Sequence, residues 1–170
     1  MVSNSVVVCT SRHQYWRPSD GPEGASYCLS WRLAVEANNV RAWRTVPTQC
    51  LRHVESYMTG GQYDREINFI IDHVISYLDG VDLSNDGLDA WILDVDDTCI
   101  SNLIYYKGKR FGSAAYKGQS AVVYKSEIRE QLEEEGYRIW DNVGDQWSDL
   151  QGNCTGNRTF KLPNPLYFVP

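Results

Sequence analysis

Two acidic loops, each following a stretch typical of a β-strand, carry the residues best suited to chemistry in this sequence. The first loop, Asp94–Thr98, comes directly after the apolar run 90–93, and the second, which contains Asp145 and Asp149, follows residues 137–143. Ligands of open α/β sheets bind beyond the carboxyl ends of the strands, so parallel neighbouring strands would bring the two loops together. Clustered carboxylates repel one another unless a cation neutralises them, and their hard oxygens suit Mg²⁺. Either loop alone could be an ordinary Asp-rich turn, but the pair in this order predicts a magnesium site.

The segments around these loops alternate between strand and helix patterns. Residues 90–93 form a short apolar run between turn residues, which predicts a strand buried on both faces. Residues 124–135 predict a helix with Ile128 and Leu132 facing inward and Gly136 just beyond its end. A second strand, 137–143, leads into the second acidic loop. The alternation predicts an α/β fold with a parallel sheet.

The segment 27–88, ahead of the acidic loops, is predicted to be an N-terminal helical region. A weak helical pattern covers 29–40, a clearer one begins near Pro47, and the clearest ends at Gly80. The second pattern places on one face Cys50, Leu51, Val54, Tyr57 and Met58. The third pattern forms a single apolar stripe of Ile67, Ile70, Ile71, Val74, Ile75 and Leu78, with His73 on its flank.

The two ends of the chain are predicted to be irregular. Residues 1–26 are rich in proline, glycine and polar residues without a sustained period, which predicts an unstructured lead-in. Residues 151–170 predict an extended tail, because Pro163 and Pro165 interrupt any central strand. Residues 89–150 between them hold both acidic loops and are expected to form the catalytic part.

Composition excludes several classes of protein. The 170 residues amount to one domain of about 100–200 residues, and 42% hydrophobic residues suffice for a packed core. The formal net charge of −6 disfavours non-specific nucleic-acid binding, and no apolar run approaches the roughly 18 residues that cross a bilayer. The first eight residues lack the basic and apolar regions of a secretory signal, so no signal peptide is expected and the compartment stays open.

Cysteines and glycosylation sequons give weaker indications. The number of cysteines is odd and their spacing has no CxxC pair, so at least one thiol is expected to stay free or to pair between chains. These cysteines are Cys9, Cys28, Cys50, Cys99 and Cys154. Sequons at Asn153 and Asn157 are glycosylation candidates that would matter only in a secreted protein.

The two acidic loops together resemble the first and fourth motifs of phosphohydrolases of the haloacid dehalogenase (HAD) type. The flanking residues are similar to plant acid phosphatases and vegetative storage proteins over about 27–112 and 114–170. The segments that carry this narrower resemblance are Trp31–Glu36, Trp43–Pro47, Trp91–Thr98, Gly136–Trp140 and Phe160–Pro165. The resemblance implies a Rossmann-like HAD-type parallel sheet and a small phosphomonoester as substrate. Whether the chain forms a homo-oligomer stays open.

The resemblance also implies roles for individual residues. Asp94 would attack phosphorus to form an aspartyl-phosphate, and Asp96 would act as general acid and then as general base. Magnesium would be held by Asp94, by the backbone carbonyl of Asp96 and by Asp145, with Asp149 behind these ligands. Thr98 would cap the loop.

The family also requires a lysine that contacts the phosphoryl oxygens and the nucleophile. Lys125 opens the predicted helix and lies 19 residues ahead of Gly144, the spacing that the resemblance implies. Lys117 is the alternative. For either residue, the non-functional interpretation is a solvated surface lysine.

One motif of the family is missing. An apolar strand ending in Ser or Thr should lie between the first acidic loop and the lysine, yet residues 99–124 contain none. These 26 residues are too few for two further strands and a cap domain, since one βαβ unit takes about 30. We therefore expect a truncated HAD-type sheet without the cap and middle strands, and weak or absent turnover. The alternatives are a non-catalytic storage-type protein and an incompletely folded splice product.

Overall fold

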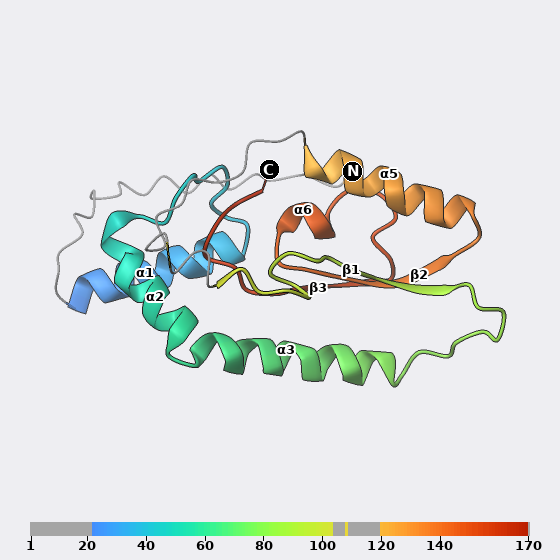
Figure 1. Cartoon of the computed structure of the whole chain (residues 1–170), viewed down its shortest axis with the longest axis horizontal. Helices are drawn as coiled ribbons and strands as arrows, with labels where there is room; N and C mark the ends of the chain where they lie inside the picture. The colour runs from blue at the N-terminus through green and yellow to red at the C-terminus, as the bar shows by residue number, and fades with distance from the viewer. Residues whose placement is uncertain (1–21, 104–107, 109–119, 170) are drawn as a thin grey trace, which may run out of the picture.

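The computed structural model describes residues 22–103, 108 and 120–169. A three-stranded parallel sheet in the order β1-β2-β3 lies between helix α3 on one face and helices α5 and α6 on the other (Figure 1). Its strands are β1 (Asp89–Leu93), β2 (Arg138–Gly144) and β3 (Arg158–Lys161). The predicted α/β class and parallel sheet are therefore confirmed, and the sheet is that of a truncated HAD-type fold.

The N-terminal helices pack beside one end of the sheet. They are α1 (Pro22–Glu36), the 3₁₀ turn η1 (Thr48–Cys50), α2 (Leu51–Thr59) and α3 (Gln62–Leu78). Helix α1 begins at Pro22, inside the segment that was predicted to be an unstructured lead-in, and ends at Glu36 instead of near residue 40. Proline suits the first turn of a helix, where its missing N–H leaves no bond unmade, so the early start has a local cause.

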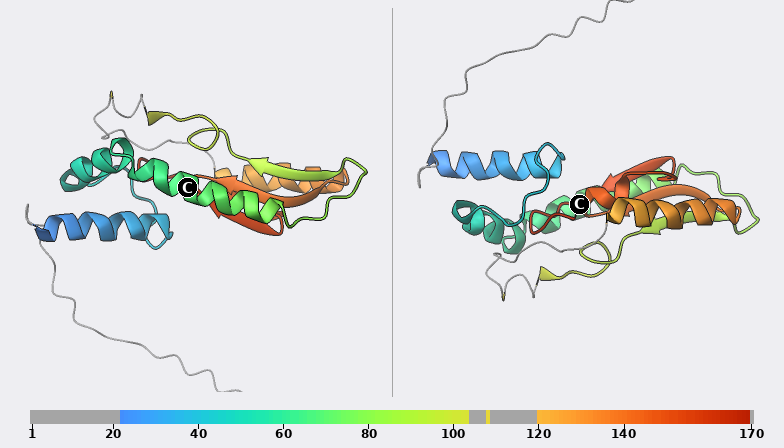
Figure 2. Two further views of the ribbon diagram at one scale, coloured as in Figure 1. Left: turned by 90° about the horizontal axis from the view of Figure 1, so that it is seen from below. Right: turned by 90° about the horizontal axis from the view of Figure 1, so that it is seen from above.

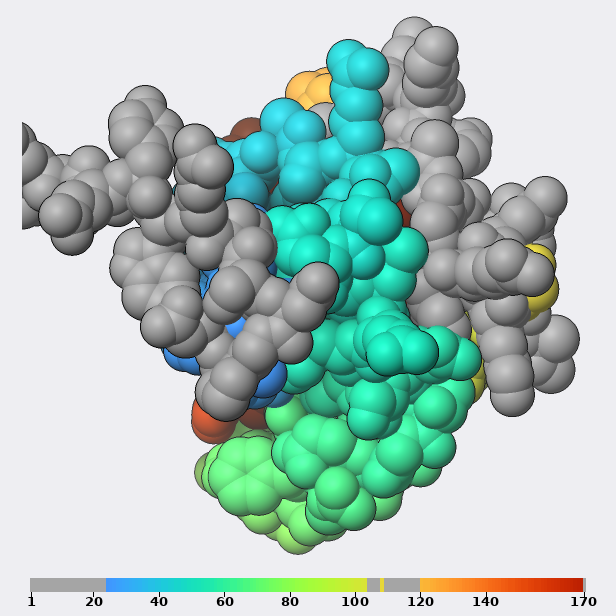
Figure 3. All heavy atoms as spheres, turned by 90° about the vertical axis from the view of Figure 1, so that its left-hand side faces the viewer, coloured from blue at the N-terminus to red at the C-terminus, as the bar shows by residue number. Residues whose placement is uncertain are grey.

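A disulfide and an apolar core hold these helices together. Cys28 in α1 is bonded to Cys50 at the end of η1, and among the described residues Cys99 and Cys154 are free thiols, whereas Cys9 lies outside them. The buried cluster around this disulfide comprises Cys28, Trp31, Val35, Val46, Cys50, Val54, Tyr57, Met58 and Leu166. It confirms most of the face that was predicted for the second helix. Helix α2 and the start of α3 form a continuous surface with the loop that follows α1 (Figure 3).

Helix α3 buries only part of its predicted apolar stripe. Ile67, Ile70 and Val74 pack with Tyr77 against Val143, Phe160 and Leu162 of the sheet and its exit. Ile71 and Ile75, which were predicted to belong to the same stripe, are exposed. The apolar stripe spreads widely around the helix, and a sheet of three strands is too narrow to cover all of it. The residues at one side of the stripe, Ile71 and Ile75, therefore stay in solvent.

Strand β1 differs from its prediction. It was expected to be buried on both faces, yet Trp91 is 40% and Leu93 is 55% exposed. The reason is its position, because β1 is the edge strand of the sheet in the described part of the chain. An apolar sequence typical of a central strand therefore stands at an edge, as the loss of neighbouring strands would cause.

Helix α5 (Ala121–Glu134) faces the sheet with a different side than predicted. Ser126 and Arg129 are its buried residues, whereas Ile128, which was predicted to face inward, is exposed. The end of the helix agrees with the prediction, since Gly136 has a φ of 96°, the left-handed conformation that glycine adopts at a helix end.

The tail combines a short strand with an extended segment. β3 pairs in parallel with β2 and ends at Lys161, before Pro163, so the prolines lie outside the ladder as predicted. The prediction did not include β3 itself. Beyond it, Asn164 and Leu166 are buried against the acidic loop and the N-terminal core. Among the described helices none has the length and apolarity that a membrane span requires.

Candidate active site

The first acidic loop turns tightly at the end of β1. Asp94 donates its backbone N–H to the carbonyl of Val143 in β2, at 3.0 Å, so its position is set by the sheet. Asp97 has a φ of 55° and is buried, and its carboxylate accepts a bond of 2.7 Å from the backbone N–H of Asn102. Aspartate tolerates this left-handed conformation better than most residues, which explains its place in the turn. The loop is therefore anchored by Asp97, a residue to which sequence analysis gave no role.

The second acidic loop passes from β2 into the short helix α6 (Trp147–Leu150). Asp149 accepts the backbone N–H of Gln146 at 2.8 Å, within a reciprocal capping box between these two residues. Gly144 is required by close approach, because a Cβ at this position would stand 2.4 Å from the Cβ of Asp149. Asp145 and Asp149 are thus held by backbone contacts at the carboxyl end of β2.

The two loops converge on Lys125. Its ammonium group lies 2.6 Å from Asp94 Oδ1 and 2.5 Å from Asp149 Oδ1. Asp94, Asp145 and Asp149 each offer a carboxylate oxygen, and these oxygens all lie within 4.8 Å of one another. Lys125 stands one turn into α5, so the strand, the crossover helix and the next strand each supply part of this acidic cluster.

Burial sets the electrostatics of the cluster. It raises the pKa of Asp145 to about 7, although bonds from Asn164 and Gln146 act in the opposite direction. Burial likewise raises the pKa of Asp149, against the bond from Lys125. For Lys125 burial acts to lower the pKa, but the bonds to Asp149 and Asp94 outweigh it and raise the pKa overall. Carboxylates that burial makes reluctant to ionise would gain from a nearby cation beyond the single lysine.

The donor set fits a hard divalent cation. It consists of carboxylate oxygens, which Mg²⁺ prefers and of which it needs only one or two from a protein. Asp145 is oriented by further contacts, as Thr98 donates to its Oδ1 at 3.3 Å and Gln146 donates to its Oδ2 at 2.8 Å. Asn164 from the tail also donates to Oδ2. Such bonds fix the direction of a metal-binding carboxylate.

Arg129 and Asn142 hold the backbone behind the cluster. Arg129 is 2% exposed and donates to the carbonyls of Asp149, Gln151 and Asn153, at 2.9, 2.6 and 2.9 Å. Asn142 donates to the same carbonyl of Asp149 at 2.7 Å. Arg129 lies one helical turn beyond Lys125 on α5. Its buried guanidinium satisfies backbone carbonyls at the end of α6 and just after it.

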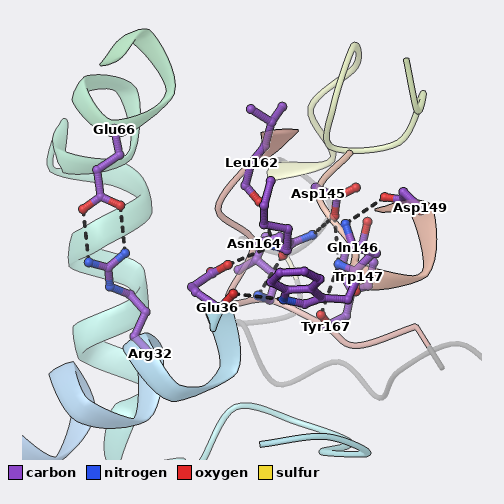
Figure 4. Close-up of polar contacts among 12 residues, drawn as sticks. Arg32, Glu36, Glu66, Asp145, Gln146, Trp147, Asp149, Leu162, Asn164 and Tyr167 are labelled. Carbon is purple, nitrogen blue, oxygen red and sulfur yellow. Dashed lines mark hydrogen bonds and ion pairs between the residues drawn. The ribbon is translucent and has the colours of Figure 1, made fainter. Parts of the chain in front are cut away.

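A second network joins the acidic loop to the N-terminal helices (Figure 4). Trp147 in α6 donates its indole N–H to the carbonyl of Glu36 at 2.9 Å, and Lys161 pairs with the carboxylate of Glu36 at 2.9 Å. Arg32, one turn before Glu36, forms a bidentate pair with Glu66 of α3, at 2.9 and 3.1 Å. The end of α1 therefore buttresses the acidic loop.

The structure brings together four of the predicted residues: Asp94, Lys125, Asp145 and Asp149. Asp149 was predicted to stand behind the metal ligands, yet its carboxylate lies as much within the cluster as that of Asp145. Thr98 contacts Asp145, in addition to its predicted place in the loop. Asp96 lies apart, since its carboxylate is exposed and accepts a bond of 3.2 Å from Asn102.

The remaining predicted residues are either exposed or outside the described part of the chain. Lys117, the alternative lysine, is outside the described residues. Both glycosylation candidates, Asn153 and Asn157, are exposed. Sequence analysis missed the supporting residues Arg129, Asn142, Gln146 and Asn164. Gln146 and Asn164 stand inside segments that carried the resemblance, so their positions were a usable signal.

A groove of about 520 Å³ runs from the cluster along β1 and α5. Asp94, Lys125 and Asp149 stand at its polar part, and most of the remaining lining is apolar. Its lining residues come from β1 and its exit, from β2, from α5 and from α6.

Comparison with known proteins places the chain in a family. The model of the HAD superfamily, subfamily IIIB (acid phosphatase), matches residues 15–120 and 114–170. Acid phosphatase 1 of Solanum lycopersicum is 32% identical over 84% of the chain and 83% of that protein. Vegetative storage protein 1 of Arabidopsis thaliana is 30% identical, over 84% and 79%, and a stem 31 kDa glycoprotein of Glycine max is 28% identical, over 84% and 83%.

These matches are longer than the chain itself. The alignment with the tomato protein extends over 212 residues, whereas this chain has 170. The tomato protein therefore has internal residues without a counterpart in this chain. The break between the two matched segments, near residues 114–120, lies where the missing motif was expected. The family model covers both acidic loops and the lysine, which the structure brings together at one edge of the sheet. The chain belongs to the HAD superfamily, subfamily IIIB, the acid phosphatase subfamily.

Proposed function

We propose that this chain binds Mg²⁺ and hydrolyses small phosphomonoesters slowly, through an aspartyl-phosphate on Asp94. The observation that supports the proposal is the contact of Lys125 with both Asp94 and Asp149, which joins the two acidic loops into one site. Both carboxylates and the lysine line the same groove, so a phosphoryl group bound there would have a fixed cation next to its nucleophile.

In the first step, an Asp94 carboxylate oxygen attacks phosphorus and forms a new O–P bond while the ester P–O bond breaks. Lys125 keeps its proton, because bonds to Asp149 and Asp94 raise its pKa. It therefore remains a positive charge beside the equatorial oxygens of the phosphoryl group. Asp149 holds Lys125 in place beside Asp94.

Proton transfer is assigned to Asp96. In its acid form Asp96 gives a proton to the leaving alkoxide, and it then takes one from the water that attacks the aspartyl-phosphate. The second attack releases phosphate and restores Asp94. Asp96 is exposed, two residues from Asp94 on the same loop, so it can reach a leaving group that enters from solvent.

Asp94 and Asp145 would hold the magnesium ion, with the backbone carbonyl of Asp96 completing the protein ligands. When bound, the ion would neutralise charge on the phosphoryl oxygens. Thr98, Gln146 and Asn164 keep Asp145 oriented for this role. Calorimetric titration with Mg²⁺ should give heat for the wild type and little for Asp145→Asn, and equal heats would contradict this assignment.

Slow turnover follows from the open groove. The family motif that would supply a hydroxyl and backbone donors to the phosphoryl group is missing from the sequence, and each such donor contributes about 10²–10³ in rate. Asp94 also stands at the end of an edge strand with exposed apolar residues, so water has free access to its surroundings. We expect turnover at least about 10²-fold below that of the same chain with the missing block restored.

The test is p-nitrophenyl phosphate hydrolysis near pH 5 with magnesium. Asp94→Asn removes the nucleophile with little change in shape and is the matched control. Slow hydrolysis that Asp94→Asn abolishes supports the proposal. Activity equal to that of the restored enzyme would contradict the expected deficit, and hydrolysis that survives Asp94→Asn would contradict the nucleophile.

A storage role is the second candidate. Two of the reported relatives are named as a storage protein and a stem glycoprotein, and the open groove leaves the site incomplete. Asp94 is retained, however, and a purely nutritional protein does not need its contact with Lys125. Absence of Asp94-dependent hydrolysis together with absence of Mg²⁺ binding would favour this candidate.

A further inference from the structure

One edge of the sheet is unpaired among the described residues. Asp94 donates its backbone N–H toward β2, and Arg138 of β2 donates to the carbonyl of Leu88. Backbone groups of a strand alternate between its two edges, so the N–H and C=O groups of Trp91 and Leu93 point away from β2. In the described part of the chain no strand pairs with them. Such an edge is a template for another strand.

The edge is apolar on both faces of the sheet. Trp91, Leu93 and Val95 lie at a period of two on β1 and its exit, and they are 40%, 55% and 56% exposed. Leu93 pairs with Val143, which packs against α3, so these side chains lie on the α3 face, whereas Asp94 points to Lys125 on the α5 face. Tyr124 and Ile128, one turn apart on α5, are 62% and 43% exposed. Figure 2 shows α5 running alongside β1 at this margin of the molecule. The free edge of β1 and the apolar side chains on either face of it therefore form one continuous surface.

We propose that this surface binds a second copy of the chain, through antiparallel pairing of β1 with itself around a two-fold axis at Trp91. The pairing would join two three-stranded sheets into one of six strands. A five-residue strand centred on Trp91 is self-complementary, because residues 89 and 93 exchange places across the axis. Each Trp91 would then face its counterpart, a favourable aromatic cross-strand pair.

The helices fit the same arrangement. Strands in a sheet are about 4.8 Å apart, so a helix resting over the β1–β2 pair would lie about 10 Å from its symmetry mate. That separation is close to the 8–10 Å of packed helices. Tyr124 and Ile128 would meet their counterparts above β1, which closes the groove of each copy with the α5 helix of the other.

The buried area is sufficient for a reversible dimer. The exposed fractions of the five apolar residues add up to about two and a half side chains, or roughly 400–600 Å² per copy at about 150–250 Å² per large side chain. Two copies would bury roughly 800–1,200 Å², near the approximate threshold of 1,000 Å² for a specific interface. An interface at this lower size limit belongs to the weak and reversible class, so we expect association in the micromolar range.

Charges do not oppose the pairing. Asp89, the only ionisable residue of β1, already binds Arg138 and the indole N–H of Trp140, each at 2.8 Å. It would stand opposite residue 93 of the second copy, which is a leucine. The two acidic clusters would lie at opposite ends of the joined sheet, so their negative charges stay apart.

Sedimentation velocity from about 1 to 100 μM tests the proposal, since this range brackets a micromolar dissociation constant. The wild type should pass from monomer to dimer. Leu93→Lys and Ile128→Glu, each at an exposed position on one face of the sheet, should weaken the dimer at least about tenfold. Leu33→Lys, at a 70% exposed position on α1 outside the groove, is the matched control and should leave the dimer intact.

Cross-linking tests the two-fold axis itself. Trp91→Cys, in a chain with Cys9, Cys99 and Cys154 replaced by serine, should form an intermolecular disulfide, because paired residues of antiparallel strands are about 5.5 Å apart. Leu33→Cys in the same background should form none. A wild type that stays monomeric, assemblies larger than a dimer, or a dimer that ignores both groove variants would overturn the proposal. None of these measurements uses phosphatase activity, so their outcome is independent of the proposed function.

Discussion

Replacing Gly144 by alanine isolates the contact that places Asp149. The new Cβ would lie 2.4 Å from Asp149 Cβ and 2.4 Å from its Oδ2, about 1 Å closer than an ordinary contact of about 3.4 Å. Both atoms belong to a residue that is 2% exposed and fixed by Lys125, Gln146 and Arg129, so it cannot rotate away freely. Overpacking of this kind costs about 1–3 kcal/mol.

The same displacement should damage the site. A shift of about 1 Å at a catalytic group costs about 10² in rate, so Asp94-dependent hydrolysis should fall by about that factor. The free energy of unfolding is measured by urea titration, and hydrolysis by the p-nitrophenyl phosphate assay. Gly80→Ala is the control, since its Cβ would meet only an ordinary contact of 3.5 Å to the carbonyl of Tyr77.

A double-mutant cycle separates the clash from other effects of the methyl group. Asp149→Gly removes the atoms that a Cβ at residue 144 would strike, so Gly144→Ala in that background should cost little stability. A loss below about 0.5 kcal/mol for Gly144→Ala alone, or an equal loss in both backgrounds, would refute the reasoning.

Three further predictions concern the lysine, a buried acid and the disulfide. Lys125→Ala should reduce Asp94-dependent turnover far more than Lys117→Ala, and the reverse order in the same assay would reassign the lysine. Burial raises the pKa of Asp141 to about 6, so its stabilising contribution is present below about pH 4 and is lost as the pH rises through about 6. Asp141→Asn should therefore raise the free energy of unfolding at pH 7, and no gain in urea titrations at pH 7 would contradict the burial argument. Replacing Cys28 and Cys50 by alanine removes a cross-link between positions 22 residues apart and should lower stability by about 3 kcal/mol, measured the same way.

The sequence predicted the site better than its surroundings, because the site depends on local order along the chain. Asp94 and Asp145 each follow a strand, and parallel pairing of β1 and β2 is enough to bring them to one edge. Lys125 follows from its place at the start of the crossover helix. Burial could not be predicted in the same way. Ile128 and Trp91 have the patterns of core residues, yet both are exposed, because in the described part of the chain no strand pairs with the outer edge of β1.

The polar residues that support the site could not be predicted from the sequence for a different reason. Arg129 looks like a solvated helix residue in the sequence, since nothing nearby in the chain offers it a carboxylate. Its partners are three backbone carbonyls of the segment 149–153, which only the fold brings within reach. Backbone acceptors have no sequence signature, so a buried arginine that binds them cannot be told from an exposed one by residue type.

We expect binding and turnover to separate in this chain, because they depend on different parts of the fold. Asp94, Lys125, Asp145 and Asp149 all belong to the β1–α5–β2 unit or to the turns at its ends, and the register of β1 on β2 is sufficient to align them. The missing residues fall within the connection between β1 and α5, where they affect neither this pairing nor the contacts of Lys125. Those residues would cover the groove beside Asp94. They would thereby exclude water from the site and supply the additional hydrogen-bond donors to the phosphoryl group that fast hydrolysis requires. We therefore expect affinity for a divalent cation to survive even where turnover is weak.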